Sequence, residues 1–385
     1  MNRWPITPLG ELAEFVMGQA PPGEECNFVG NGTPFVKAGE FGSLRPIIRE
    51  WTTRPLRLAR ASDVFVCVVG ATCGKLNLGA DCAIGRSVAA IRPNEGQLDQ
   101  RFLYAFLQGW TMRLRSGSQG SAQGVISREM LERLPVPTFS LPEQRRIVAI
   151  LDQAENLRTL REQADHRTAD LIPALFHEMF GDPGTNSKLW PVNPVQQLLT
   201  IPPRNGISPS KQGRYVAKVL TLSAITGDGF DAAEVKESTF AAIHRDIHRV
   251  NTNDLLTCRG NGNRELVGSG HFPKHSMPDV AFPDTMIALR FDQNQIDRDY
   301  AETVWNDRST RAQITRHART TNGTFKVNHE ILNSITLPVP PLPLQKQFAA
   351  AVADIRDMQQ KQAASKKRLD DLFHSLLHRA FRGEL

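Results

Sequence analysis

The chain has 385 residues, of which 40% are apolar and 22% are charged. This length exceeds what one compact core usually covers, and this composition excludes a wholly disordered protein. The 46 lysines and arginines against 40 aspartates and glutamates give a net charge of +6, which is compatible with nucleic-acid binding and far below that of a histone-like polycation.

The first 139 residues are rich in glycine, proline and short β-type runs, which predicts a mixed α and β globule. Strands are predicted at Val64–Val69 and Ser87–Ile91, and helical periodicity appears over Arg101–Leu114. The loop Gly70–Lys75 resembles a phosphate loop, but it is one residue short of the P-loop spacing and is followed by Leu76. We therefore predict no nucleotide site there.

A long amphipathic helix is predicted directly after this globule, over residues 140–183. Ser140–Glu143 supplies a capping serine, a proline in the first turn and a glutamate three residues after the cap. Apolar residues then recur at steps of three and four until Gly181–Gly184 ends the helix. Pro173 lies inside the helix, where it should cause a kink or a short break because proline has no N–H.

The chain then repeats itself. Trp4–Leu9 recurs as Trp190–Val195, and Leu134–Pro137 recurs as Leu337–Pro340. Further pairs keep the same order: Asp63 with Asp254, Arg92 with Arg290, and His177 with His378. Each copy of about 190 residues is a globule followed by a long helix. The predicted segments are globules at 1–139 and 184–341 and long helices at 140–183 and 342–385.

Two long amphipathic helices that follow equivalent globules can bury their apolar stripes against each other, and a two-fold relation makes them antiparallel. The predicted fold class is α+β, with two tandem pseudo-symmetric α+β domains separated by two long antiparallel coiled-coil helices.

Residues suited to nucleic-acid contacts gather in loops of both copies. Arg259–Arg264 combines arginine and asparagine, which bind guanine and adenine edges, with glycines that allow close approach. A plain Asn-Gly turn with exposed arginines is the alternative interpretation. Gly70–Lys75 is the counterpart in the first copy. The candidate DNA-binding residues are Arg45, Lys75, Arg86, Ser121, Gln123, Arg259, Asn261, Asn263, Arg264, Arg316, Arg319, Thr321, Asn322 and Lys326.

Neither a metal site nor a catalytic site is predicted. The five cysteines include no CxxC pair, and the histidine pairs at four-residue spacing have no neighbouring cysteine. We find no S-adenosylmethionine glycine loop, no adenine-pocket motif of a methyltransferase and no nuclease triplet. No apolar run reaches the roughly 18 residues of a membrane helix and no signal peptide opens the chain, so we expect a soluble, cytoplasmic protein.

The order of these motifs resembles the specificity subunit of type I restriction–modification enzymes. The resemblance rests on the tandem globules, each opened by Trp-Pro and closed by Leu-Pro-Val-Pro, and on the helix starts Leu141–Gln144 and Leu342–Gln345. The loops 118–123 and 320–324 add to it. It implies two target-recognition domains, each contacting one half of a split DNA sequence. It also implies that the helices set the spacer and dock two methyltransferase subunits, with Gln144, Arg145, Gln345 and Lys346 as candidate partner contacts.

The resemblance further implies a chain that is not an enzyme and holds no cofactor. S-adenosylmethionine, and ATP with Mg where a nuclease is present, would belong to an adenine-specific methyltransferase and to restriction or translocase subunits. Alternative interpretations are a specificity subunit of a related restriction or anti-phage defence system with a different catalytic partner, a catalytic nuclease or methyltransferase, or a purely structural coiled-coil scaffold.

Overall fold

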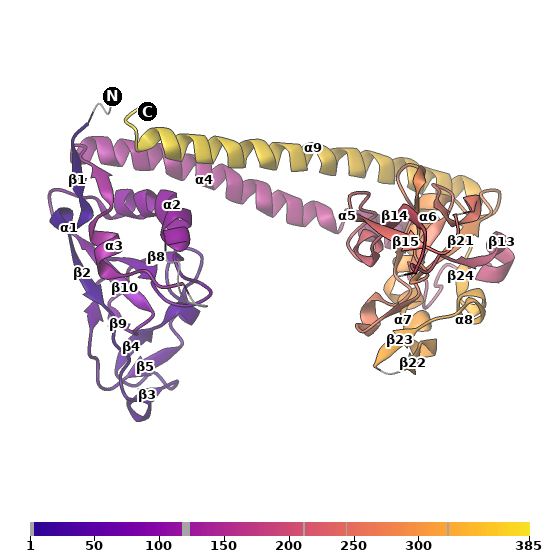
Figure 1. Cartoon of the computed structure of the whole chain (residues 1–385), viewed down its shortest axis with the longest axis horizontal. Coiled ribbons are helices and arrows are strands. Elements are labelled where there is room, and N and C mark those ends of the chain that lie inside the picture. Colours follow the sequence, from indigo (N-terminus) through magenta and orange to yellow (C-terminus); the bar gives the residue numbers. More distant parts are fainter. Residues whose placement is uncertain (1–3, 118–123, 211, 244, 322) are drawn as a thin grey trace. The chain divides into compact units, whose positions relative to one another are not determined.

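The computed structural model describes residues 4–117, 124–210, 212–243, 245–321 and 323–385 (Figure 1). Contacts within the chain define two compact units. Unit 1 comprises Met1–Gln163 and Gln362–Leu385, and unit 2 comprises Ala164–Lys361. No helix in the described ranges is both long and apolar enough to span a lipid bilayer.

A four-stranded sheet is the centre of unit 1. Its strands, in spatial order, are β2 (Ala13–Met17), β10 (Val88–Pro93), β7 (Val64–Cys67) and β8 (Leu76–Leu78). Val64 and Val66 pack into the core that also holds the helices, whereas Phe65 and Cys67 pack into a second core. Because neighbouring side chains of a strand point to opposite faces, both faces of this sheet are buried.

The second core of unit 1 is shared with a five-stranded sheet that contains β4 and β9 in parallel. That sheet has the strands β3 (Cys26–Asn27), β5 (Glu50–Thr52), β4 (Thr33–Val36), β9 (Cys82–Ile84) and β6 (Leu58–Ala59). The remaining elements of the globule are β1 (Ile6–Pro8), paired with β11 (Pro135–Pro137), and the helices α1 (Leu9–Leu12), α2 (Gln100–Gly117) and α3 (Arg128–Glu132).

Unit 2 repeats this topology. Its central sheet has the order β13 (Leu199–Asn205), β21 (Met286–Phe291), β17 (Leu255–Cys258) and β19 (Gly270–His271). Its second sheet has the order β15 (Val235–Phe240), β14 (Tyr215–Leu220), β20 (Met277–Ala281) and β16 (Arg249–Val250), with β14 and β20 parallel. The pair of β12 (Val192–Pro194) with β24 (Thr336–Pro338) matches that of β1 with β11. The predicted internal repeat is therefore confirmed.

Unit 2 also contains a third sheet and the helices of its globule. A three-stranded sheet has the order β18 (Gly260–Asn261), β23 (Thr324–Lys326) and β22 (Arg319–Thr321). The helices of the globule are α6 (Arg298–Asn306), α7 (Arg308–His317) and α8 (His329–Ser334). Helices α6 and α7 follow β21, which is the counterpart of β10, the strand that α2 follows in unit 1.

The first long helix is interrupted, as Pro173 predicts. Helix α4 spans Leu141–Ala169, and a separate helix α5 spans Leu171–Phe180. Pro173 cannot donate a hydrogen bond to the Ala169 carbonyl, so the regular ladder ends there. The ladder restarts where the Ala174 N–H donates to the Asp170 carbonyl at 3.0 Å.

The long helices run antiparallel wherever they meet inside one unit. In unit 1 the Arg146 guanidinium donates to the Leu385 carbonyl of the chain end, and the Arg158 guanidinium lies 2.7 Å from Asp370 of α9 (Leu342–Ala380). In unit 2 the Gln359 amide donates to the Thr168 carbonyl at 3.0 Å. The predicted α+β class with tandem pseudo-symmetric domains and antiparallel long helices is confirmed, whereas the four predicted segment boundaries stay a prediction.

A buried carboxylate–arginine pair crosses the central sheet of each unit. Asp63 is fully buried, and its two oxygens accept from Arg92 at 2.9 and 3.0 Å. Asp254 is equally buried, accepts from Arg290 at 2.8 and 2.9 Å and also faces Arg204 at 2.5 Å. The hydrogen bond to Asp254 is the main cause of a raised pKa of the Arg290 guanidinium.

We expect the Asp254→Asn variant to lose about 3 kcal/mol of unfolding free energy, because two arginines are left without their buried counter-charge. The matched control is Asp246→Asn, which removes an ion pair to Arg249 at a carboxylate that is 94% exposed. Urea denaturation of the full chain gives both values. Equal loss in the two variants would contradict the proposed importance of the buried pair.

Candidate nucleic-acid interface

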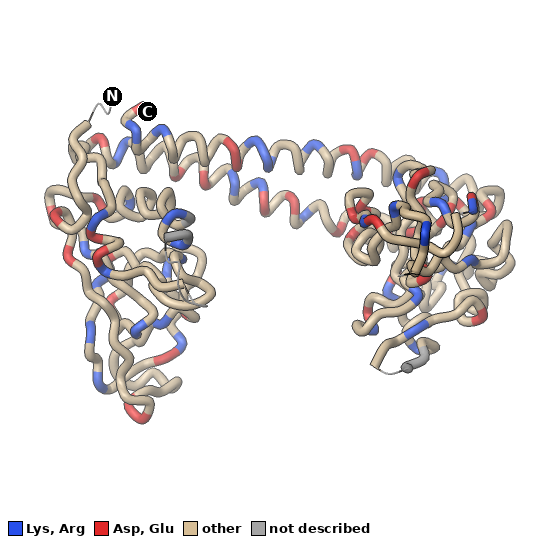
Figure 2. The backbone as a smooth tube through the Cα atoms, viewed as in Figure 1, with Lys and Arg blue, Asp and Glu red and all other residues tan. Residues whose placement is uncertain are grey.

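The three-stranded sheet of unit 2 brings together two groups of predicted DNA-binding residues that are distant in the sequence. Gly260 of β18 pairs with Lys326 of β23, and Asn261 pairs with Phe325. Strand β22 then pairs with the other edge of β23. Figure 2 shows lysine and arginine residues along this part of unit 2, and the Lys326 side chain is exposed.

The two asparagines of this region shape its turn. The Asn263 N–H donates to Asn261 Oδ1 at 2.8 Å, and the Glu265 N–H donates to Asn263 Oδ1 at 3.0 Å. Such bonds are typical of Asx turns, which is the structural alternative weighed for this sequence. Because both side-chain oxygens already accept, the amide NH₂ groups are the better suited atoms for a contact with another molecule. A two-point contact with adenine would have to share the oxygen with the turn.

The arginines here are held by the unit's own backbone. Arg259 Nη1 donates to the Asp284 carbonyl at 3.2 Å, and Arg264 Nη2 donates to the Thr315 carbonyl at 2.8 Å. The Arg264 guanidinium also lies 5.8 Å from the centre of the Phe325 ring. One fixed nitrogen orients a guanidinium while its other donors stay in place for phosphate or guanine.

One residue beside this cluster, His329, was not predicted from the sequence. His329 lies beside Arg259, and its Nε2 atom is 3.0 Å from Asn205 Oδ1. Burial, together with the Arg259 charge, lowers the pKa of His329. A neutral imidazole adds a hydrogen-bonding group without adding charge.

The other predicted residues of unit 2 are only partly placed. Arg316 is exposed at the end of α7. Arg319 and Thr321 lie in β22, but their side chains are not among the described ones, and Asn322 is outside the described residues. The cluster that the structure brings together is therefore that of Arg259, Asn261, Asn263, Arg264 and Lys326.

Unit 1 also brings together two candidate loops that are distant in the sequence. Val69 and Val125 form an antiparallel bridge, and the Gly70 N–H donates to the Gly124 carbonyl at 3.2 Å. The loop Gly70–Lys75 thus lies next to the segment that follows residues 118–123. Ser121 and Gln123, predicted as DNA contacts, fall within residues 118–123, which are outside the described residues.

The basic candidates of unit 1 differ in how their charge is held. Lys75 Nζ donates to the Phe41 carbonyl at 2.7 Å, and Arg45 Nη1 donates to the Gly79 carbonyl at 2.6 Å. Both side chains are bound to their own backbone, although both residues are exposed. Arg86 is exposed too.

The predicted partner contact at Gln144 needs correction. The Gln144 side chain is 1% exposed. Its Oε1 accepts from the Asp99 N–H at 2.8 Å, and its Nε2 donates to the carbonyls of Gln97 at 2.8 Å and Phe139 at 2.9 Å. A side chain with all its polar capacity turned inward cannot contact another subunit in this fold. We therefore assign it a structural role.

Gln345 repeats the arrangement in unit 2. It is fully buried, accepts from the Asp297 N–H at 2.7 Å, and donates to the carbonyls of Gln295 at 3.3 Å and Pro340 at 2.7 Å. The duplicated helix start therefore marks a structural glutamine, and the partner-contact prediction is withdrawn for both glutamines. Arg145 and Lys346, the next residues in each helix, are exposed, so the partner-contact prediction stands for these two residues.

No group of three or more potential metal ligands occurs among histidine, cysteine, aspartate and glutamate in the part of the chain that the structure describes.

Comparison with known proteins shows which proteins this chain resembles. Residues 1–166 match the family model of the type I restriction modification DNA specificity domain. The putative type I restriction enzyme MjaX specificity subunit of Methanocaldococcus jannaschii is 30% identical over 170 residues, which are 42% of this chain and 40% of that protein. The type I restriction enzyme EcoKI specificity subunit of Escherichia coli K12 is 25% identical over 334 residues, which are 80% of this chain and 70% of that protein.

The fold agrees with this class. A solved structure from work on complex assembly and conformational transition of the type I R-M system has a TM-score of 0.68 and 17% identity, and covers 99% of this chain and 98% of its own. The resemblance to type I restriction–modification specificity subunits, predicted from the motifs, is confirmed. These similarities do not favour the alternative interpretations of the sequence.

Replacing Gln144 with leucine should lower the unfolding free energy by about 2–3 kcal/mol, because the Asp99 N–H and two carbonyls are left buried without partners. The control is Arg145→Ala at the exposed neighbouring position, which should change stability by less than about 0.5 kcal/mol. Chemical denaturation checks both. A Gln144→Leu variant as stable as the parent, with weaker binding to a partner, would restore the partner-contact interpretation.

Proposed function

We propose that the chain is the DNA-specificity subunit of a type I restriction–modification complex and that each unit recognises one half of a bipartite DNA target. The observation that carries this proposal is the duplication. Two copies of one fold place a pair of loops at the same position, and the loops differ in their polar residues between the copies. Such an arrangement suits two different short sequences held by one scaffold.

In unit 2, the contact surface that we propose is the sheet of β18, β23 and β22. A two-stranded ribbon fits the major groove of B-form DNA, where arginine can bind the edge of guanine with two hydrogen bonds. Arg259 and Arg264 supply such guanidinium groups, and Lys326 and Arg316 are suited to phosphates. In unit 1, the corresponding contacts would come from the loops beside the bridge of Val69 with Val125, with Arg45, Lys75 and Arg86 as candidates.

The catalytic partners belong to the same proposal. Two methyltransferase subunits would dock near the starts of α4 and α9, at Arg145 and Lys346, and would carry S-adenosylmethionine. Restriction or translocase subunits would carry ATP and Mg. The lengths of α4 and α9 would set the gap between the half-sites. The complex would act in the cytoplasm, where bacterial and archaeal DNA is found.

Replacing Arg259, Asn261 and Asn263 together with alanine should relax or abolish recognition of one half-site and leave the other half of the methylated motif unchanged. Each lost arginine–guanine pair should cost about 1–3 kcal/mol of binding free energy. Mapping methylated adenines in cells that contain the variant complex measures this directly. The control is Lys274→Ala, which removes an exposed cation of unit 2 outside the three-stranded sheet.

The assignment of the loop is wrong if the triple variant changes both halves of the motif, or neither. If the parent complex shows no sequence-dependent methylation at all, the proposed function itself is wrong.

A further inference from the structure

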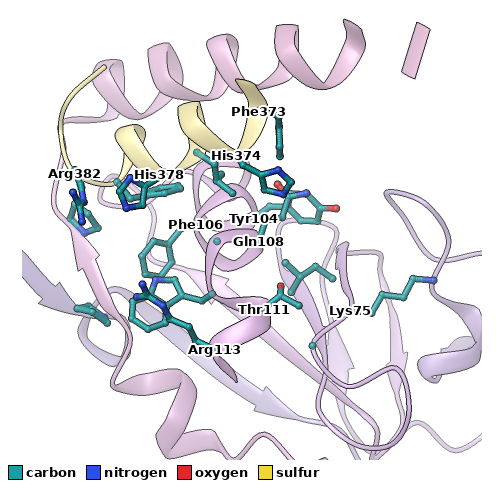
Figure 3. Close-up of a pocket in the computed structure, with 18 of the residues that line it drawn as sticks. Lys75, Tyr104, Phe106, Gln108, Thr111, Arg113, Phe373, His374, His378 and Arg382 are labelled. Carbon is teal, nitrogen blue, oxygen red and sulfur yellow. The ribbon is translucent and has the colours of Figure 1, made fainter. Parts of the chain in front are cut away.

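A small hollow of unit 2 lies beside the three-stranded sheet of β18, β23 and β22. Its volume is about 260 Å³, and the residues that line it are all polar: Asn205, Arg259, Asn328, His329 and Glu330. This volume is below that of pockets that enclose a whole small molecule, so the hollow suits the edge of a larger one. A hollow of unit 1 is larger, but its wall includes the apolar Phe106 and Phe373 (Figure 3). The hollow of unit 2 is thus the better site for a hydrogen-bonding ligand.

The hollow lies at the edge of the central sheet from which the three-stranded sheet extends. Strands β13 and β17 both pair antiparallel with β21, so they run in the same direction and their carboxyl ends share one edge. Asn205 is the last residue of β13, and Arg259 directly follows β17. The Arg259 carbonyl accepts from the Val327 N–H at 2.9 Å, which brings His329, the first residue of α8, to the same place.

The internal repeat shows that the fold itself does not require the pair of Arg259 and His329. In unit 1 the matching backbone bond runs from the Ile126 N–H to the Val68 carbonyl at 2.9 Å. Val68 therefore corresponds to Arg259, and Arg128, the first residue of α3, corresponds to His329. Val68 is 2% exposed and belongs to the core of unit 1. Because the same fold forms with a buried valine, the arginine and the histidine point to a contact that unit 2 makes and unit 1 does not.

The hydrogen bonds within the hollow fix which groups the two side chains present. Arg259 Nη1 donates to the Asp284 carbonyl at 3.2 Å, and the Nε and Nη2 donors lie side by side on another edge of the guanidinium. His329 Nε2 is 3.0 Å from Asn205 Oδ1. Burial and the Arg259 charge lower the pKa of His329, so its ring is neutral near pH 7 and carries one N–H. Because an amide oxygen can only accept, this N–H is on Nε2, and Nδ1 is an acceptor.

Two adjacent donors beside one acceptor match the edge of a single base pair. In the major groove guanine presents two acceptors, N7 and O6, and its partner cytosine presents the N4 amino group as a donor. We propose that Arg259 donates to the guanine, and His329 Nδ1 accepts from the cytosine amino group, of one G·C pair in the half-site of unit 2. This inference rests on the proposed function. Thymine has the acceptor O4 in place of the amino group, so His329 is a specificity-determining residue that rejects an A·T pair.

Chemical removal of the cytosine amino group tests the proposal. Mapping of methylated adenines first gives the motif of the parent complex, and the half that the Arg259→Val variant alters is the half-site of unit 2. Duplexes are then made in which pyrimidin-2-one, a base without the amino group, replaces each cytosine of that half-site in turn. We expect one position at which this replacement raises the dissociation constant of the parent complex about tenfold.

Variants of the two residues complete the test. His329→Leu removes the acceptor, so it should bind the normal duplex and the modified duplex equally well. Arg259→Val introduces the residue that unit 1 has at this position, and should relax the preference for guanine in the same base pair. His275→Leu makes the matched change at an exposed histidine of unit 2 that does not line the hollow, and should keep the tenfold difference.

The inference is overturned, and the proposed function stays intact, if no modified duplex weakens the parent complex or if His329→Leu keeps the tenfold difference. Glu330 also lines the hollow, and a carboxylate can accept from cytosine. The inference is therefore also overturned if Glu330→Gln, and not His329→Leu, removes the difference. If the parent complex shows no sequence-dependent methylation, the proposed function fails and the inference fails with it.

Discussion

A buried glutamine amide fixes each long helix to its globule. Gln144 and Gln345 lie in the first turn of α4 and α9, and each amide bonds the N–H that begins the globule's own helix and two backbone carbonyls. A buried amide that loses these partners is costly, so the direction of the helix follows from the position of the globule. The junction thus joins each long helix to the globule that carries the candidate contact loops.

In each unit the central sheet supports the loops at the ends of its strands. Both faces of the central sheet are buried, and a carboxylate–arginine pair ties neighbouring strands at Asp63 and at Asp254. The loops that follow β7 and β17 can therefore differ in sequence without changing the fold. In unit 1 the Lys75 ammonium donates to the Phe41 carbonyl, whereas in unit 2 Arg259 and Arg264 donate to the carbonyls of Asp284 and Thr315. Different chemistry on one scaffold is what the proposed recognition of two different half-sites requires.

Local signals made the scaffold predictable. Capping residues and apolar periodicity placed the starts of the long helices, the repeated motifs predicted the duplicated topology, and Pro173 predicted the break that separates α4 from α5. These features depend on residues close in the sequence, which is why they could be predicted. The positions of β7 and β10 followed from continuous apolar runs.

Contacts between distant residues were not predictable in the same way. Gln144 and Gln345 look like polar surface residues of a helix, and only the tertiary fold buries them. Strands of two or three residues such as β18 and β23 carry no periodicity, so their pairing had no signal. The asparagine oxygens were expected to face DNA, but turn formation uses them first.

The central claim is that one chain carries two recognition units for two separate half-sites. Mapping of methylated adenines in a genome that expresses this chain with its methyltransferase partner tests it most directly. The account predicts a motif in two specific parts, separated by a gap of fixed length and unspecified sequence. A single continuous motif, or methylation without sequence preference, would contradict the account.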